Sequence, residues 1–203
     1  MRKIFVTGIG TDIGKTVVSS ILVEALKADY WKPVQAGTYY ATDSEKVKNT
    51  IGNDKSVVHP ESYRLKEHMS PHAAAEMEGI KIDFDKIILP ETDNTLIIEG
   101  AGGLMVPLND KYFMIDLIKK FDAEVIVVIQ NYLGSINHSI LTIDALKQRG
   151  LKIIGLVFNG SPHQLSHNII LKYSGLPCIS SITKEVRIDK DVIKKYAKDF
   201  KMI

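Results

Sequence analysis

The sequence has little cysteine and no long run of apolar residues. Cys178 is the only cysteine among 203 residues, so no intramolecular disulfide and no metal site built from several thiolates can form. This cysteine usage fits a reducing compartment, and we expect a cytoplasmic protein. No apolar run approaches the roughly 20 residues that span a bilayer. Met1 leads directly into a short apolar strand without the pattern of a signal peptide, so we also expect no membrane partner.

An excess of charge of one sign is lacking as well. The chain has 26 Lys and Arg residues against 24 Asp and Glu residues, a net charge of +2. Proteins that bind nucleic acid usually carry a clear basic excess, so we expect no nucleic-acid partner. The composition, 45% hydrophobic and 25% charged, is that of a globular protein. No internal repeat or low-complexity linker divides the chain, and we expect a single domain over residues 1–203.

Apolar runs alternate with segments of helical period along most of the chain. Strands are expected at residues 3–7, 30–35, 95–99, 124–129, 151–158 and 177–179. Helices are expected at residues 15–28, 70–78, 112–121, 136–149 and 189–200. This alternation predicts an α/β fold, a mostly parallel sheet with helices on both faces. Residues 41–70 are the least regular, and we interpret them as surface structure that carries function.

The strongest motif lies between the first expected strand and helix, and reads Gly8-Ile9-Gly10-Thr11-Asp12-Ile13-Gly14-Lys15-Thr16. Glycines let the backbone N–H groups turn toward phosphate oxygens, and the following helix adds its positive end. Lys15 would reach the β and γ phosphates, and the Thr16 hydroxyl would ligate Mg²⁺. The usual spacing would place a glycine at Ile9, so this loop is a variant with one extra residue. A glycine turn without a ligand is the alternative, but the strand–loop–helix order favours nucleotide binding and a P-loop NTPase fold.

A second motif, Glu99-Gly100-Ala101-Gly102-Gly103, follows the strand expected at residues 95–99. Ligands of open parallel sheets gather outside the carboxyl ends of the strands, so Glu99 belongs at the same edge as the phosphate loop. A carboxylate at that edge can hold Mg²⁺, which takes few protein carboxylates and keeps several waters. A solvated acid in a glycine turn is the alternative, and the phosphate loop favours the metal.

The sequence pattern leaves the roles of two further residues, Lys32 and Asp43, undecided. Lys32 lies inside an apolar run, where an unpaired ammonium is costly to bury. Either it extends to solvent or it faces an anion in a site. Asp43 lies in a polar segment, and spacing alone does not favour it over Asp54, so residues 49–54 remain a rival region for a metal ligand.

Taken together, the motifs resemble the dethiobiotin synthetase family. The resemblance is carried by the phosphate loop, Lys32-Pro33-Val34-Gln35, Ser70-Pro71-His72, the motif that begins at Glu99, and Asn137-His138. It runs from residue 3 to about residue 160. Many ATPases share the phosphate loop, whereas its combination with the motif that begins at Lys32 and the motif that begins at Glu99 is quite specific to this family. A helix-capping Ser-Pro with a solvated His72 would explain the third motif equally well.

The resemblance implies an ATP-dependent cyclo-ligase of biotin biosynthesis. Members of the family are homodimers that bind 7,8-diaminononanoate near the subunit interface. One amine captures CO2 as a carbamate, ATP phosphorylates the carbamate, and the second amine closes the ureido ring. The substrates would therefore be 7,8-diaminononanoate, CO2 and ATP, with Mg²⁺ as the cofactor.

The resemblance also assigns roles to residues. The catalytic residues would be Lys15 and Lys32, and the ligands of Mg²⁺ would be Thr16, Asp43 and Glu99. ATP would be bound by Asp12, Ile13, Gly14, Lys15, Thr16, Val17, Asp43, Glu99, Gly100, Ala101, Gly102 and Asn159, the last at the adenine. Substrate would be bound by Thr11, Lys32, Thr38 and Asn137. Ala36 stands where the family usually has Ser or Thr, which is why Thr38 is included. Residues 180–183 replace a Gly-x-Ile-Pro-like turn that many members have near the adenine.

Three rival functions are weighed against this one. Switch ATPases that position chromosomes or septa share the variant loop, but they carry a lysine where this chain has Gly10. A cobyrinate-type amidotransferase synthetase needs a glutaminase domain that 203 residues cannot include. A nucleotide-binding structural module, with Lys32 only a surface lysine, is the non-enzymatic alternative.

Overall fold

The computed structural model describes residues 1–39 and 41–200. The strands of the described residues are β1 (Lys3–Gly8), β2 (Asp29–Trp31), β3 (Val34–Gln35), β4 (Val58–His59), β5 (Tyr63–Arg64), β6 (Leu96–Glu99), β7 (Glu124–Gln130), β8 (Ile153–Asn159) and β9 (Cys178–Ile182). The helices are α1 (Lys15–Leu26), α2 (Asp43–Thr50), α3 (Pro71–Met77), α4 (Met114–Phe121), α5 (Ser135–Gln148), α6 (Gln164–Ser174) and α7 (Lys190–Asp199), with a 3-10 turn, η1, at Phe84–Lys86.

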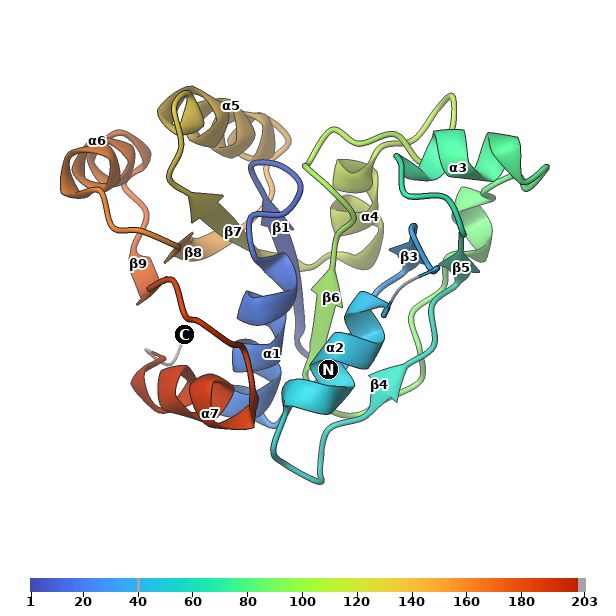
Figure 1. Ribbon diagram of the computed structural model, residues 1–203. Coiled ribbons are helices and arrows are strands. Elements are labelled where there is room, and N and C mark those ends of the chain that lie inside the picture. Colours follow the sequence, from blue (N-terminus) through green and yellow to red (C-terminus); the bar gives the residue numbers. More distant parts are fainter. Residues whose placement is uncertain (40, 201–203) are drawn as a thin grey trace.

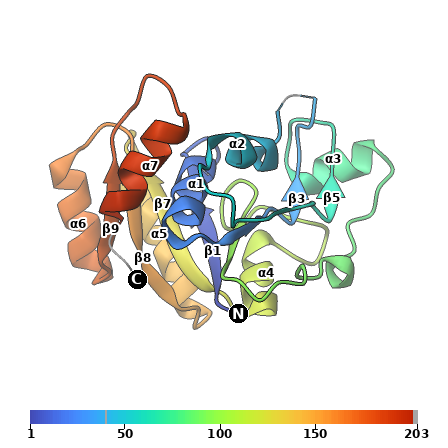
Figure 2. The same ribbon diagram turned by 90° about the horizontal axis from the view of Figure 1, so that it is seen from below.

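The main sheet is parallel and has the strand order β4-β2-β6-β1-β7-β8-β9. Helices α1, α2 and α7 cover one face, and α4 and α5 cover the other, with α6 beside α5 (Figures 1 and 2). Residues 125–129 of β7 are all buried, because both faces of a parallel sheet are covered. The predicted α/β class, the parallel sheet and the helices on both faces are confirmed.

The run at residues 30–35 does not form one strand as predicted. β2 ends at Trp31 in the main sheet, whereas β3 pairs with β5 in a separate two-stranded sheet. Pro33 has no N–H to donate, so it cannot continue a central strand. Its carbonyl accepts from Ser62 N and Tyr63 N instead. The chain therefore leaves the main sheet at Lys32.

Residues 41–70 are more regular than predicted, because they contain α2, β4 and β5. Helix α2 begins with a reciprocal capping box, in which Thr42 Oγ1 accepts from Glu45 N at 3.2 Å and Glu45 Oε2 accepts from Thr42 N at 2.8 Å. Helix α6 was not predicted, and β9 extends to Ile182 instead of ending at residue 179.

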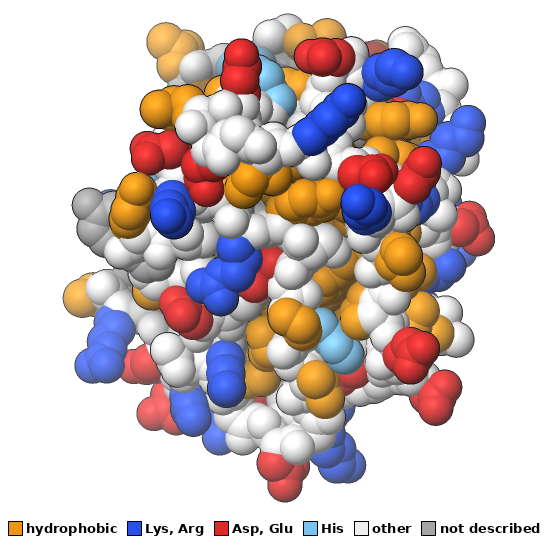
Figure 3. Space-filling model, turned by 90° about the vertical axis from the view of Figure 1, so that its right-hand side faces the viewer, with side chains coloured by type: hydrophobic (Ala, Val, Ile, Leu, Met, Phe, Trp, Pro, Cys, Tyr) orange, Lys and Arg blue, Asp and Glu red, His pale blue; other side chains and the backbone are white. Residues whose placement is uncertain are grey.

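The surface around α3 and β5 mixes charges of both signs. Basic and acidic side chains are interspersed there with hydrophobic ones, as Figure 3 shows for the right-hand side of Figure 1. Within residues 1–39 and 41–200, no helix combines the length and the apolar character needed to cross a membrane.

Candidate active site

Three neighbouring strands of the main sheet, β2, β6 and β1, end at the same edge. The chain leaves β2 at Lys32 and β6 at Glu99, and it leaves β1 into the phosphate loop. Since the carboxyl ends of parallel strands lie together, these residues share a cavity of about 750 Å³. Residues 35–37, the first turn of α2, residues 68–71 and the turn after β6 complete its lining.

The phosphate loop is held in a curled conformation. Asp12 and Gly14 have left-handed φ angles of 57° and 92°. A Cβ atom at Gly8 would lie 2.0 Å from Ile13 Cδ1, so glycine at this position leaves room for the Ile13 side chain to pack against the start of the loop. Helix α1 begins at Lys15 directly behind the loop, so the positive end of its dipole faces the cavity.

Lys15 is buried and turned back onto its own loop. Its Nζ donates to Gly10 O at 2.7 Å. The pKa of Lys15 is lowered to about 8, because burial and the nearby charge of Lys32 together outweigh the opposing charge of Glu99. A phosphate oxygen would offer Nζ an anionic partner in place of a neutral carbonyl and would favour the charged lysine.

Glu99 is only 1% exposed, yet both of its carboxylate oxygens are hydrogen-bonded. Oε1 accepts from Thr16 Oγ1 at 2.9 Å and from Lys32 Nζ at 3.1 Å. Oε2 accepts from Tyr30 Oη at 2.9 Å. A buried carboxylate is tolerated only with such partners, and here they come from α1, the end of β2 and β2 itself.

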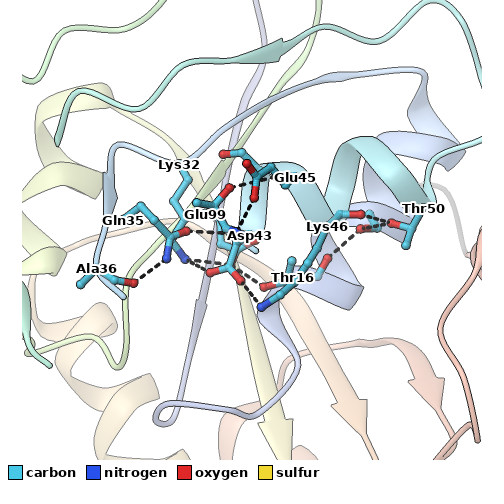
Figure 4. Close-up of polar contacts among 12 residues, drawn as sticks. Thr16, Lys32, Gln35, Ala36, Asp43, Glu45, Lys46, Thr50 and Glu99 are labelled. Atoms are coloured by element: carbon cyan, nitrogen blue, oxygen red, sulfur yellow. Dashed lines mark hydrogen bonds and ion pairs between the residues drawn. The ribbon is translucent and has the colours of Figure 1, made fainter. Parts of the chain in front are cut away.

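Lys32 is 4% exposed, and its ammonium lies between two carboxylates, which answers the question that the sequence left open. Beside Glu99, Asp43 Oδ2 lies 2.5 Å from Nζ (Figure 4). Burial lowers the pKa of Lys32, but the charges of Glu99 and Asp43 outweigh this and raise the pKa above its usual value. Lys32 therefore stays charged and faces anions in the site.

Asp43 is brought to the cavity by the start of α2. Burial alone would raise its pKa, but the charges of Lys32 and Lys46 and their hydrogen bonds together outweigh burial and hold the pKa at about 2. The rival Asp54 is exposed, and its neighbour Asn53 hydrogen-bonds Glu24 toward the other end of α1. The structure thus brings Asp43, and not Asp54, next to Lys32.

Gln35 and Lys46 are site residues that the sequence did not single out. Gln35 Oε1 accepts from Asp43 N at 3.0 Å, while its Nε2 donates to Ala36 O at 2.7 Å, so it fixes the start of α2 (Figure 4). Lys46 lies one turn further along α2, and its Nζ is 3.1 Å from Asp43 Oδ1. Gln35 belongs to the motif of Lys32, which is the only signal in the sequence that would have pointed to it.

Most of the residues assigned to the site meet at this cavity. Its lining includes Thr11, Asp12, Gly14, Lys15, Thr16, Val17, Lys32, Asp43, Glu99, Ala101 and Gly102. Ile13 is buried beneath the loop, and Gly100 N donates to Val6 O of the neighbouring strand β1.

Besides Ile13 and Gly100, three assigned residues lie outside the lining of the cavity. Thr38 N donates to Leu65 O, and Asn137 is exposed on α5. Asn159, at the end of β8, donates from Nδ2 to Ile13 O at 2.9 Å and so contacts the phosphate loop from behind. His72 is exposed on α3, whereas Ser70 and Pro71 before it do line the cavity.

The oxygen donors at this edge fit Mg²⁺. Thr16 Oγ1 and Glu99 are in contact, and Lys32 already places a positive charge between Glu99 and Asp43. The described residues contain no group of three or more His, Cys, Asp or Glu side chains that would hold a metal. Mg²⁺ needs no such group, because it takes one or two carboxylates and completes its shell with phosphate oxygens and water.

The loop, the sheet and the buried lysines define a P-loop nucleotide-binding protein. A family model described as "AAA domain" matches residues 2–191. The fold is similar to that of the septum site-determining protein MinD of Pyrococcus horikoshii, solved with Mg-ADP, with a TM-score of 0.57, 13% identity and coverage of 98% of this chain and 95% of that one. This likeness shows the fold alone.

Sequence relatives give the family. The chain is 52% identical over 198 residues to the ATP-dependent dethiobiotin synthetase of Cytophaga hutchinsonii, covering 97% of this chain and 96% of the relative. It is 50% identical over 200 residues to that of Christiangramia forsetii, covering 98% and 96%. The chain belongs to the ATP-dependent dethiobiotin synthetase family, the ligases to which its motifs pointed.

Proposed function

We propose that the cavity closes the ureido ring of dethiobiotin, with 7,8-diaminononanoate, CO2 and ATP as substrates. The observation that carries this proposal is the convergence of Lys32 and Glu99 on the phosphate loop, with Nζ and Oε1 3.1 Å apart. Phosphoryl transfer needs alignment and neutralisation of charge more than covalent help from the protein. Lys15 and Lys32 supply fixed positive charge in a buried place, where it acts most strongly.

The residues divide into three sets. Thr16, Asp43 and Glu99 would hold Mg²⁺, which would neutralise the oxygens of the β and γ phosphates. Asp12 to Val17 and the turn Glu99 to Gly102 would bind the phosphates of ATP, with Asn159 at the adenine. Thr11, Lys32, Thr38 and Asn137 would bind the diamine and its carbamate.

The reaction joins three substrates in sequence. One amine of the diamine attacks CO2 and loses a proton, which gives a carbamate. An oxygen of the carbamate attacks the γ-phosphorus, and ADP leaves. The second amine then attacks the carbon of the phosphorylated carbamate and loses a proton, the bond from this carbon to the phosphate oxygen breaks, and the ureido ring closes as phosphate leaves. Lys15 and Lys32 contact the carbamate and the phosphoryl group, and the shared cavity makes each attack effectively intramolecular.

We further propose that the protein is a homodimer that uses α5. Leu133 before the helix and Ile136 and Leu141 within it are exposed, Leu133 completely. Leu141 follows Asn137 by four residues, so these two side chains lie on the same side of the helix. A partner on this side would bury Leu141 and bring Asn137 to the carboxylate of the substrate. The single domain over residues 1–203 and the cytoplasmic location stay predictions.

The test is a measurement of phosphate release together with mass-spectrometric identification of the product. Release should require both the diamine and bicarbonate, and it should match dethiobiotin one to one. Turnover without the diamine but stimulated by DNA or lipid would indicate a switch ATPase. ATP binding without turnover under any condition would indicate a structural nucleotide-binding module.

A further inference from the structure

We infer that Tyr30 is a positioning residue, which orients the carboxylate of Glu99 so that one of its oxygens faces the metal and the phosphates. The hydroxyl of Tyr30 donates to Glu99 Oε2 at 2.9 Å. Tyr30 is completely buried and Glu99 is 1% exposed, so water does not compete for this bond. The inference rests on the proposed role of Glu99 as a metal ligand.

The two oxygens of Glu99 have partners of different kinds. Oε1 accepts from Thr16 and Lys32, which both line the cavity. Oε2 accepts from Tyr30, which does not. The phenol therefore holds the carboxylate from behind, and Oε1 is the oxygen whose present partners a ligand in the cavity can replace.

Tyr30 is suited to this task because it remains a hydrogen-bond donor. Its hydroxyl donates to Glu99 Oε2, and a carboxylate oxygen can only accept from it. β2 pairs directly with β6, with Tyr30 opposite Ile97 and Trp31 opposite Ile98. The donor is thus carried by a strand that is fixed in register against the strand that ends in Glu99.

Groups that hydrogen-bond the ligands of a metal fix ligand orientation, and their loss typically weakens metal binding by about 10–100-fold. The variant Tyr30→Phe keeps the ring and removes only the hydroxyl. We expect it to raise the Mg²⁺ concentration for half-maximal ADP binding by about tenfold, with kcat at saturating Mg²⁺ close to that of the unchanged protein. Calorimetric titration of ADP at a series of Mg²⁺ concentrations measures the first quantity without turnover.

Tyr63→Phe is the matched control. It removes a phenol hydroxyl that accepts from Asp83 N at 2.9 Å and that does not contact Glu99. We expect Tyr63→Phe to lower the melting temperature and to leave the Mg²⁺ dependence unchanged. If Tyr30→Phe behaves in the same way, the hydroxyl of Tyr30 is only structural and the inference is wrong.

Glu99→Gln, alone and combined with Tyr30→Phe, separates this inference from the proposed function. If Tyr30 acts through the carboxylate, Tyr30→Phe adds little to the Mg²⁺ requirement once Glu99 is Gln. If Glu99→Gln raises the Mg²⁺ requirement and Tyr30→Phe does not, the role of Tyr30 is overturned while that of Glu99 stands. An unchanged Mg²⁺ requirement in Glu99→Gln removes the metal role of Glu99, and the inference falls with it.

Discussion

Two buried carboxylates lie at opposite ends of neighbouring strands of the main sheet. Glu99 lies at the carboxyl end of β6, and Asp29 lies at the amino end of β2. They are exposed by 1% and 3%. Asp29 accepts from Val57 N at 2.9 Å, Thr92 Oγ1 at 2.7 Å and Asn94 Nδ2 at 3.2 Å, and it contacts His59 Nε2 at 3.2 Å. None of these partners lines the cavity, whereas Thr16 and Lys32 beside Glu99 both do.

The difference shows that burial of a charge does not by itself indicate function. Asp29 is satisfied by the chain alone, and its partners join β2, β4 and the segment before β6. Glu99 shares Oε1 with a hydroxyl and an ammonium that a ligand can displace. We therefore expect changes around Glu99 to affect chemistry and changes around Asp29 to affect folding.

Lys32→Ala should have the largest effect. Removal of one hydrogen-bond donor that stabilises negative charge in a transition state typically lowers kcat by about 10²–10³-fold. We expect at least that loss in dethiobiotin formation, with the Kd for MgATP within about threefold, because Lys15 and the loop amides still hold the phosphates. Product formation by mass spectrometry and Kd by calorimetry are the two measurements.

Lys46→Ala is the control for Lys32. Lys46 also contacts Asp43, but it is an exposed lysine of the kind whose ion pairs contribute about 0–1 kcal/mol. It should change kcat by less than about threefold. Loss of MgATP binding in proportion to activity in Lys32→Ala would contradict the role of Lys32 at the carbamate.

Asp29→Ala should lower stability and leave activity nearly unchanged. The change leaves several buried donors without an acceptor, and we expect the free energy of unfolding to fall by about 2–3 kcal/mol, with kcat within about twofold. Urea unfolding and steady-state kinetics measure both. Asp93→Ala, at an exposed neighbouring acid, should change neither.

The loss of stability caused by Asp29→Ala should also depend on pH. Burial alone would raise the pKa of Asp29, but hydrogen bonds led by that from Val57 N outweigh burial and lower it. A lowered folded-state pKa contributes stability above the ordinary pKa of about 4, and this contribution is lost as pH falls through the folded value. The gap between the unchanged protein and Asp29→Ala should therefore narrow in acid. An equal gap at pH 7 and pH 3 would contradict this explanation.

The sequence predicted the parts of the site that follow from strand order. The phosphate loop is continuous in the chain, and strand ends share an edge, so Glu99 could be placed beside the loop without knowledge of rotamers. The pattern left the direction of the Lys32 side chain open, and only the family resemblance assigned it to the site. Tyr30 was not foreseen, because it lies 69 residues from Glu99 and acts through the direction of one hydroxyl. Asp43 could not be separated from Asp54 before α2 was placed.

The elements that were missed bury few apolar side chains. The buried residues of α2 are Ser44 and Val47, and those of α6 are His167, Ile170 and Ser174, so neither helix shows an apolar period. The start of α2 was nevertheless present in the sequence, as Thr42 followed three residues later by Glu45. Local capping chemistry would have located this helix where hydrophobic periodicity did not.

Asn159 extends the comparison between the carboxyl ends of the strands, where Glu99 lies, and their amino ends, where Asp29 lies. It is a neutral residue at the carboxyl end of β8 that hydrogen-bonds the phosphate loop. Nδ2 donates to Ile13 O at 2.9 Å, and a Cβ atom at Gly14 would lie 2.1 Å from Nδ2. Loss of one hydrogen bond costs about 1 kcal/mol, so we expect Asn159→Ala to weaken the binding of inorganic tripolyphosphate about fivefold, as measured by calorimetry. Tripolyphosphate has no base, so this effect reports on the loop and not on the adenine.

Asn159→Asp is the matched variant, since it keeps the size of the side chain and removes the donor to Ile13 O. It should weaken tripolyphosphate binding at least as much as Asn159→Ala, while both variants should lower the free energy of unfolding less than Asp29→Ala does. If ATP binding weakens in both variants and tripolyphosphate binding stays unchanged, Asn159 acts on the adenine alone. The hydrogen bond to Ile13 O would then not contribute to phosphate binding, and only the residues that line the cavity would bind the phosphates.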